Sequence, residues 1–188
     1  MDPTNSSWQC DAAVDLAFIL DASGSIFSYY QDYISLIKKV VDHFPISESG
    51  TRIALLLFSN DKIHSVGLNE HETSSSFLEG LKNLPEPMGN SRISYALEAS
   101  YKSLYENSDP RTNVPKVMVV LSDGFYISTP SDGKTPEQAA DEMESYGVKV
   151  IDQISFFFTE PNYPSWHTTL EQRRFDVASA SMQRRIAY

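Results

Sequence analysis

The chain lacks the features that mark several large classes of protein. Its single cysteine, Cys10, excludes an internal disulfide and any zinc site built on several cysteines. No stretch approaches the ~20 consecutive apolar residues that a membrane-spanning helix needs. Basic residues are also few, with 15 Lys and Arg against 25 Asp and Glu and a net charge of −10. This charge disfavours nucleic acid and anionic membranes as partners, and it favours cations and basic surfaces.

Motifs of nucleotide binding and of common catalytic classes are missing as well. The sequence holds no G-x-G-x-x-G, G-x-x-x-x-G-K-[ST], H-E-x-x-H or G-x-S-x-G pattern. A nucleophilic Ser23 or Ser25 would need a histidine, and none of the four histidines falls predictably at a strand end. We therefore expect a binding protein and not an enzyme. The first residues, Met1 to Ser7, also lack the basic and apolar regions of a secretory signal.

Strand-like segments alternate with helix-like segments along the sequence. The runs 14–20, 53–58 and 117–121 are almost entirely apolar, as in strands buried on both faces of a parallel sheet. A shorter run, 148–151, predicts a further strand, and 62–68 alternates like the edge strand of a hairpin. This order predicts a doubly wound, Rossmann-like α/β fold whose mainly parallel central sheet is covered by helices on both faces.

The segments between these strands show the apolar spacing of amphipathic helices. Ser28 with Gln31 predicts a capping box at the start of the first helix, and Thr135 with Gln138 predicts another at the last. Two further helices follow one another between the second and third apolar runs. Asp15 and the acidic run 141–144 are assigned to the solvated surface.

Side chains with oxygen atoms occupy the loops that follow the strands. Asp21, Ser23 and Ser25 lie at alternate positions after the first strand, Asp123 follows the third apolar run, and Ser91 begins a helix between them. Ligands of open parallel sheets bind beyond the carboxyl ends of the strands, where these loops would meet. Such oxygen donors suit Mg²⁺ first, with Mn²⁺ or Ca²⁺ as alternatives, and do not suit zinc.

These loops resemble those of a known family, the von Willebrand factor type A domains of integrins and many matrix proteins. Segment 21–25 (Asp-Ala-Ser-Gly-Ser) is similar to the family's Asp-x-Ser-x-Ser signature, and 119–124 is similar to its aspartate–glycine loop. Ser91 falls where the family usually has threonine. The resemblance covers about residues 14–151 and implies the same fold.

The resemblance also implies a metal-ion-dependent adhesion site on Asp21, Ser23, Ser25, Ser91 and Asp123. In this site the serines bind the metal, the aspartates often act through water, and a Glu or Asp of a protein partner completes the coordination. The implied function is cation-dependent protein binding in adhesion or in the extracellular matrix, and the implied location is extracellular. Because no signal precedes the domain, an intracellular scaffold or assembly subunit with this fold is the alternative.

The ends of the sequence depart from the family pattern. Residues 1–13 are interpreted as an N-terminal flank and 14–188 as one von Willebrand factor type A domain. Asp152 and Gln153 are expected to interrupt the fifth strand. Segment 158–188 diverges from the family, so the terminal strand and helix are expected to be missing or altered.

Overall fold

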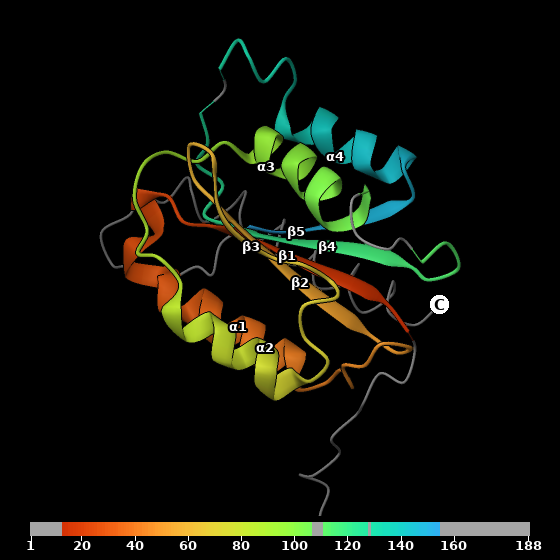
Figure 1. Ribbon diagram of the computed structural model, residues 1–188. Helices are drawn as coiled ribbons and strands as arrows, with labels where there is room; N and C mark the ends of the chain where they lie inside the picture. The colour runs from red at the N-terminus through yellow and green to blue at the C-terminus, as the bar shows by residue number, and fades with distance from the viewer. Residues whose placement is uncertain (1–12, 107–110, 128, 155–188) are drawn as a thin grey trace, which may run out of the picture.

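A computed structural model describes residues 13–106, 111–127 and 129–154. In this part of the chain, a five-stranded sheet lies between two layers of helices (Figure 1). The strands are β1 (Asp15–Asp21), β2 (Arg52–Phe58), β3 (Lys62–Val66), β4 (Lys116–Ser122) and β5 (Val148–Ile154). The α-helices are α1 (Tyr30–Val41), α2 (Ser74–Gly80), α3 (Ile93–Ser100) and α4 (Pro136–Ser145). Shorter helical segments are η1 (Gly24–Tyr29), η2 (Leu81–Asn83) and the π-helical η3 (Tyr101–Glu106).

The strands are ordered β3-β2-β1-β4-β5. β1 is parallel to β2 and β4, β4 is parallel to β5, and only β3 runs antiparallel to its neighbour. The predicted fold class and the hairpin edge are therefore confirmed. β2 and β4 lie on opposite sides of β1, so the direction of winding reverses between β1 and β4. This reversal creates the crevice in which ligands of doubly wound sheets bind.

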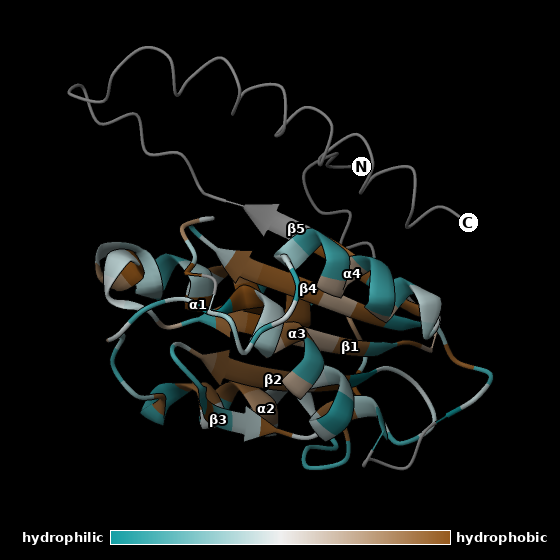
Figure 2. Ribbon diagram, turned by 90° about the horizontal axis from the view of Figure 1, so that it is seen from above, coloured by the Kyte–Doolittle hydropathy of each residue, from teal (hydrophilic) through white to brown (hydrophobic). Residues whose placement is uncertain are grey.

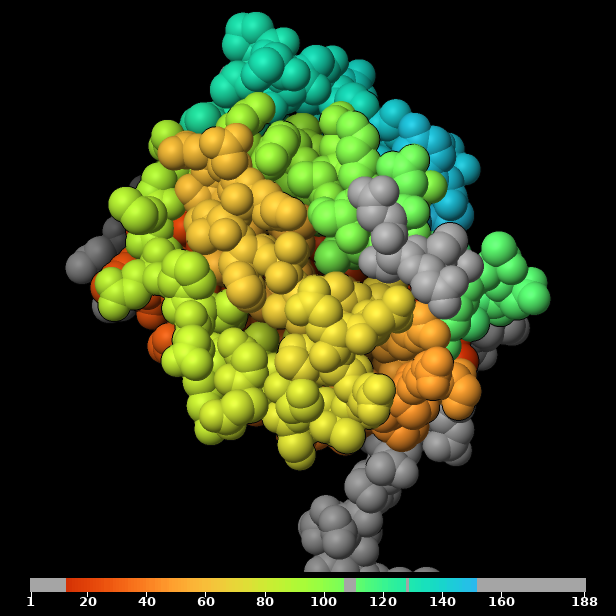
Figure 3. Space-filling model, viewed as in Figure 1, coloured from red at the N-terminus to blue at the C-terminus, as the bar shows by residue number. Residues whose placement is uncertain are grey.

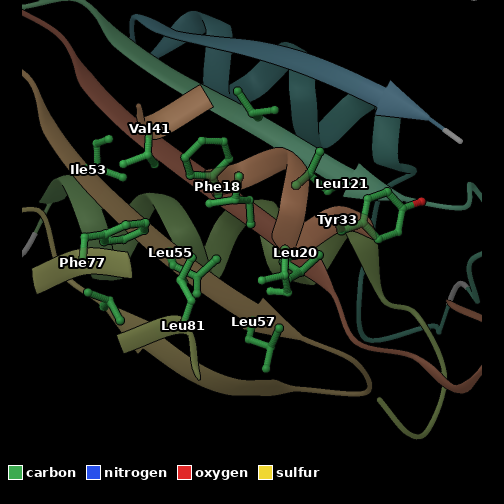
Figure 4. Packing of buried hydrophobic residues seen from close by; sticks show 14 of the residues in the cluster. Phe18, Leu20, Tyr33, Val41, Ile53, Leu55, Leu57, Phe77, Leu81 and Leu121 are labelled. Atoms are coloured by element: carbon green, nitrogen blue, oxygen red, sulfur yellow. The ribbon is translucent and has the colours of Figure 1, made fainter. Parts of the chain in front are cut away.

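Helices cover both faces of the sheet, and each face has its own hydrophobic core. α1 and α2 lie on one face and α3 and α4 on the other (Figure 1). Successive residues of β1 point to opposite faces, so Phe18 enters the first core and Ile19 the second. Figure 4 shows Phe18 in the first core with Phe77 of α2 and Val41 of α1. Seen from above, the central strands are strongly hydrophobic (Figure 2).

The start of α1 differs from the predicted capping box. The chain first forms the 3₁₀ turn η1, and α1 then begins at Tyr30 without a side-chain cap. Ile26 is fully buried within η1, which draws the loop onto the core and leaves Ser28 exposed before the helix. The box predicted at the last helix is present, because Thr135 and Gln138 cap α4 reciprocally.

Two more expectations are corrected by the structure. Asp15 is buried on β1 and does not lie on the solvated surface, because Arg111 pairs with its carboxylate. β5 runs on through Asp152 and Gln153, which are paired to β4 by backbone hydrogen bonds that polar residues also make. The flank 1–13 lies outside the described residues except for residue 13, and so does the whole of 158–188. Among the described helices, none has the length and apolar character required to cross a membrane.

Candidate metal centre

The carboxylate of Asp21 is the point at which three loops meet. Asp21 ends β1 and is completely buried. Its Oδ2 accepts hydrogen bonds from Ser91 Oγ at 2.7 Å and from Ser122 Oγ at 2.8 Å. Its Oδ1 accepts a hydrogen bond from the Ser23 backbone N–H at 2.8 Å. The structure thus joins β1, the segment before α3 and the end of β4 at one buried carboxylate.

Ser23 and Ser25 present their hydroxyl groups side by side. The two Oγ atoms lie 3.1 Å apart, with Ser23 buried and Ser25 exposed. Two oxygens bound to Mg²⁺ at about 2.1 Å and at right angles are separated by roughly 3.0 Å. The observed spacing therefore fits two neighbouring positions of an octahedral coordination shell.

Asp123 lies in the turn after β4 and is half-buried. Its Oδ1 accepts a hydrogen bond from the Phe125 backbone N–H at 3.0 Å, and Gly124 adopts φ +80° in the same turn. Burial, together with the negative charges of Asp123 and Asp21, raises the pKa of the Tyr33 phenol on α1. Both predicted carboxylates therefore lie close enough to act on one side chain.

Asp21 lacks a positive partner among the described residues. No lysine or arginine of that part of the chain forms an ion pair with it. Burial raises the pKa of its carboxyl group, although hydrogen bonds from Ser91, Ser23 and Ser122 act in the opposite direction. Its negative charge is thus stabilised by dipoles alone, and a cation beside it would supply the missing counter-charge.

Backbone hydrogen bonds hold the three loops to one another. The Gly24 N–H donates to the Gly89 carbonyl at 2.9 Å, which joins the loop after β1 to the segment before Ser91. The Ile127 N–H donates to the Ser91 carbonyl at 2.8 Å, which joins the loop after β4 to the same segment. These bonds fix where Ser23, Ser25 and Ser91 lie without using their hydroxyl groups.

Ser122 is a site residue that sequence reasoning missed. Its hydroxyl donates to Asp21, and it also accepts a hydrogen bond from the Gly124 N–H at 3.1 Å. Leu20 and Leu121 are partners in the parallel register, so the residues that follow them lie side by side. The signal in the sequence is a polar residue directly after the apolar run 117–121.

The chemistry of the donors fits a hard divalent cation. Within the described ranges, no three His, Cys, Asp or Glu residues gather as a metal-binding group. The candidate centre instead combines serine hydroxyl oxygens with two carboxylates. Since Ser91 donates its proton to Asp21, the lone pairs of its Oγ are free to face an ion. Mg²⁺, Mn²⁺ and Ca²⁺ all prefer such oxygen ligands.

Comparison with known proteins agrees with this fold. The model of the von Willebrand factor type A domain family matches residues 15–152, and the chain belongs to this family. The resemblance recognised in the loop motifs is therefore confirmed.

Human integrin alpha-11 is 23% identical over 145 residues, which are 76% of this chain and 12% of the integrin. The collagen alpha-1(XII) chain of Notophthalmus viridescens is 30% identical over 154 residues, 76% of this chain and 16% of the collagen. A solved structure of proximal thread matrix protein 1 from the mussel byssus has a zinc-occupied MIDAS motif. It aligns with a TM-score of 0.66 at 26% identity, covering 77% of this chain and 36% of the mussel protein. The similarity thus spans a small part of these relatives.

Proposed function

We propose that this domain binds a divalent cation and uses it to hold a protein partner. Mg²⁺ is the first candidate, with Mn²⁺ and Ca²⁺ as alternatives. The hydroxyls of Ser23, Ser25 and Ser91 would bind the ion directly. Asp21 and Asp123 would contribute negative charge without binding the ion directly. The observation that carries the proposal is the convergence of three oxygen-bearing loops on a buried carboxylate that no cationic side chain neutralises in the described residues.

The division of roles follows from burial and hydrogen bonding. Asp21 accepts hydrogen bonds from donors of three loops, so it orients the Ser91 hydroxyl and contributes charge. Ser25 is exposed and Asp123 is half-buried, so the centre opens to solvent on their side. A bound cation would present an open coordination position there, which favours a Glu or Asp carboxylate of the partner. Neutral hydroxyl ligands would leave the ion electrophilic towards that carboxylate.

The proposed role is adhesion or binding within the extracellular matrix, by a domain that works as a binding module and not as an enzyme. Relatives among integrins and collagens, and the mussel matrix protein, support this role and an extracellular location. A described histidine also serves another purpose, since His71 Nδ1 hydrogen-bonds to Ser76 Oγ at 2.6 Å, in a segment separate from the three loops. His71 is therefore not placed to act as a base for Ser23 or Ser25.

Calorimetric titration with MgCl₂ tests the cation site. The wild type is expected to bind Mg²⁺ with a stoichiometry of one, and Asp21→Ala is expected to give no heat of binding. Ser28→Ala serves as the control because Ser28 is exposed and makes no cap to α1. Equal heats in wild type and Asp21→Ala, or no heat in either, would contradict the proposal.

Adhesion is tested separately on immobilised collagen and on other purified matrix proteins. Binding is expected in Mg²⁺, is expected to disappear in EDTA, and should return when Mg²⁺ is restored. Binding that is unchanged in EDTA would contradict the metal-dependent mechanism, even if calorimetry detects Mg²⁺ binding.

A further inference from the structure

Exposed apolar side chains gather on the loops of the candidate metal centre. Phe27 follows Ser25 by two positions and is 61% exposed, and Phe125 follows Asp123 by two and is 64% exposed. Met88 lies three positions before Ser91 and is 71% exposed. Each of the three loops therefore carries a large apolar side chain that faces solvent. Large apolar side chains exposed on neighbouring loops are a feature of surfaces that bind other proteins.

A pocket adjoins one of these side chains. It lies between the β2–β3 turn and the segment before α3, and its volume is about 310 Å³. Figure 3 shows these two parts of the chain, coloured gold and yellow-green, beside one another on the surface. Ile63, Pro85 and Met88 are its apolar lining residues, and polar residues of the turn together with Glu86 also line it. This volume is at the lower end of the ~300–1,000 Å³ of small-molecule pockets, so it suits a side chain better than a cofactor.

The pocket is tied to the metal-binding loops by short hydrogen bonds. The Met88 N–H donates to the Ala22 carbonyl at 2.8 Å, and Ser59 Oγ donates to the Met88 carbonyl at 2.7 Å. Gly89 has φ +83°, and a Cβ there would lie 2.6 Å from Ser59 Oγ, so glycine allows the two walls to approach. The pocket is therefore part of the same rigid assembly as Ser23.

The distance between the pocket and the metal centre determines how far apart the apolar side chain and the carboxylate of a ligand must be. Gly89 lines the pocket, and its carbonyl accepts the N–H of Gly24, next to Ser25, at 2.9 Å. It is also two residues from Ser91, a span of at most about 7 Å. In an extended peptide, side chains two positions apart lie on the same face at a similar separation, about 6.6 Å. One extended segment can thus reach both places. Since the chain carries a net charge of −10, a segment with a single carboxylate and apolar neighbours suits it better than a strongly acidic one.

We propose that this pocket receives an apolar side chain of the partner segment whose carboxylate binds the cation. The ligand is then an extended protein segment with one Glu or Asp and a Leu-, Ile- or Phe-like residue about two positions away. This inference rests on the proposed function and adds the chemistry of the partner. The exposed Phe27 and Phe125 lie on the other loops. They would contact apolar side chains of the partner segment that do not enter the pocket.

Short synthetic peptides test the proposal directly. Each has one Glu in a Gly/Ser background and a single Leu that is moved through the other positions, with binding measured by fluorescence anisotropy in Mg²⁺ and in EDTA. Leu about two positions from Glu is expected to tighten Mg²⁺-dependent binding about ten-fold. Met88→Ser and Ile63→Ser are expected to remove this advantage. Tyr146→Ser, which alters an exposed aromatic residue at the end of α4, should keep it.

Different experimental results would contradict the pocket assignment and the cation site. A Leu preference that persists in Met88→Ser and Ile63→Ser, or the absence of any such preference, would overturn the pocket assignment. So would a wild type that binds Mg²⁺ in calorimetry but none of the peptides. Failure to take up Mg²⁺ in calorimetry, by contrast, overturns the proposed function itself.

Discussion

Arg92 and Asp132 connect two of the loops that carry the candidate metal centre. Arg92 directly follows Ser91, and its Nε donates to Asp132 Oδ1 at 3.1 Å, with a second bond from the same guanidinium. Asp132 Oδ2 accepts a further hydrogen bond from the Thr129 N–H at 2.7 Å. Its side chain is only 1% exposed. The position of Ser91 therefore depends on a buried ion pair that reaches into the loop after β4.

This pair predicts a dependence of stability on acid pH. The hydrogen bond from Arg92 holds the pKa of Asp132 below its ordinary value of 3.8. Because the folded-state pKa is lowered, the stabilisation is complete above the ordinary value and is lost as the pH falls through the lowered pKa. Asp132→Asn is expected to reduce the free energy of unfolding at neutral pH by about 1–3 kcal/mol. Urea unfolding between neutral and acid pH measures both effects.

The acid-dependent part of the stability should be smaller in Asp132→Asn than in the wild type. Glu79→Gln is the control, because its ion pair with Lys82 is exposed and surface pairs contribute little. Identical pH profiles for wild type and Asp132→Asn would contradict the assignment.

Two substitutions of Ser91 separate the hydroxyl from the shape of the side chain. Ser91→Ala removes the proposed ligand and the hydrogen bond to Asp21, so the affinity for Mg²⁺ is expected to fall about 10–100-fold. Ser91→Thr keeps the hydroxyl and adds one methyl, and it should retain the affinity within a few-fold. Calorimetry on both variants checks this, and equal losses would show that the hydroxyl does not bind the ion.

Metal binding should also stabilise the folded domain. An ion that binds only the native state at 100 times its Kd adds about 2.7 kcal/mol to the free energy of unfolding. The melting temperature of the wild type is thus expected to rise with MgCl₂ and to return to its starting value in EDTA. Ser23→Ala should show no such rise. A rise of equal size in the variant would indicate a general salt effect.

Asp15 and Arg111 form a second buried ion pair at the opposite end of β1. Arg111 Nε donates to Asp15 Oδ1 at 3.1 Å, and the side chain of Asp15 is 2% exposed. Asp15→Ala would leave the Arg111 guanidinium with backbone carbonyls as its only partners in the described residues and no carboxylate, and it is expected to cost about 3–5 kcal/mol. Asp141→Ala is the matched control, since Asp141 is exposed on α4. Chemical denaturation compares them, and similar costs for the two would disprove the importance of burial.

The two predicted capping boxes give a direct comparison of sequence and structure. Thr135 Oγ1 accepts a hydrogen bond from the Gln138 N–H, so Thr135→Ala is expected to destabilise the domain by about 1 kcal/mol. Ser28→Ala should have almost no effect, because α1 begins at Tyr30 without a side-chain cap. Thermal unfolding of the two variants measures the difference. An equal loss in both would mean that Ser28 does cap a helix.

The central strands and the three loops were predictable because their signals are local. A strand buried on both faces must be apolar at nearly every position, which is why runs such as 53–58 stand out. Polar residues at the ends of such runs lie at one edge of a parallel sheet, so the convergence of Asp21 and the end of β4 follows from topology.

The features that the sequence could not predict depend on contacts between distant residues. Asp15 resembles a surface aspartate until the fold brings Arg111 to it from 96 positions away. Ser122 looks like an ordinary turn residue until the register of β1 and β4 sets it beside Asp21. The pocket near Met88 likewise exists only because the β2–β3 turn lies against the segment before α3.

β1 carries a buried carboxylate at each end, and the two differ in what balances them. Asp15 has its positive partner within the chain, whereas Asp21 has only hydrogen-bond donors in the described residues. Each of these contacts is made by the chain's own residues, so the strand can form before any ion arrives. On the proposed function, folding and activation are separate events. A domain synthesised where divalent ions are scarce would reach its native shape first and become adhesive only on meeting them.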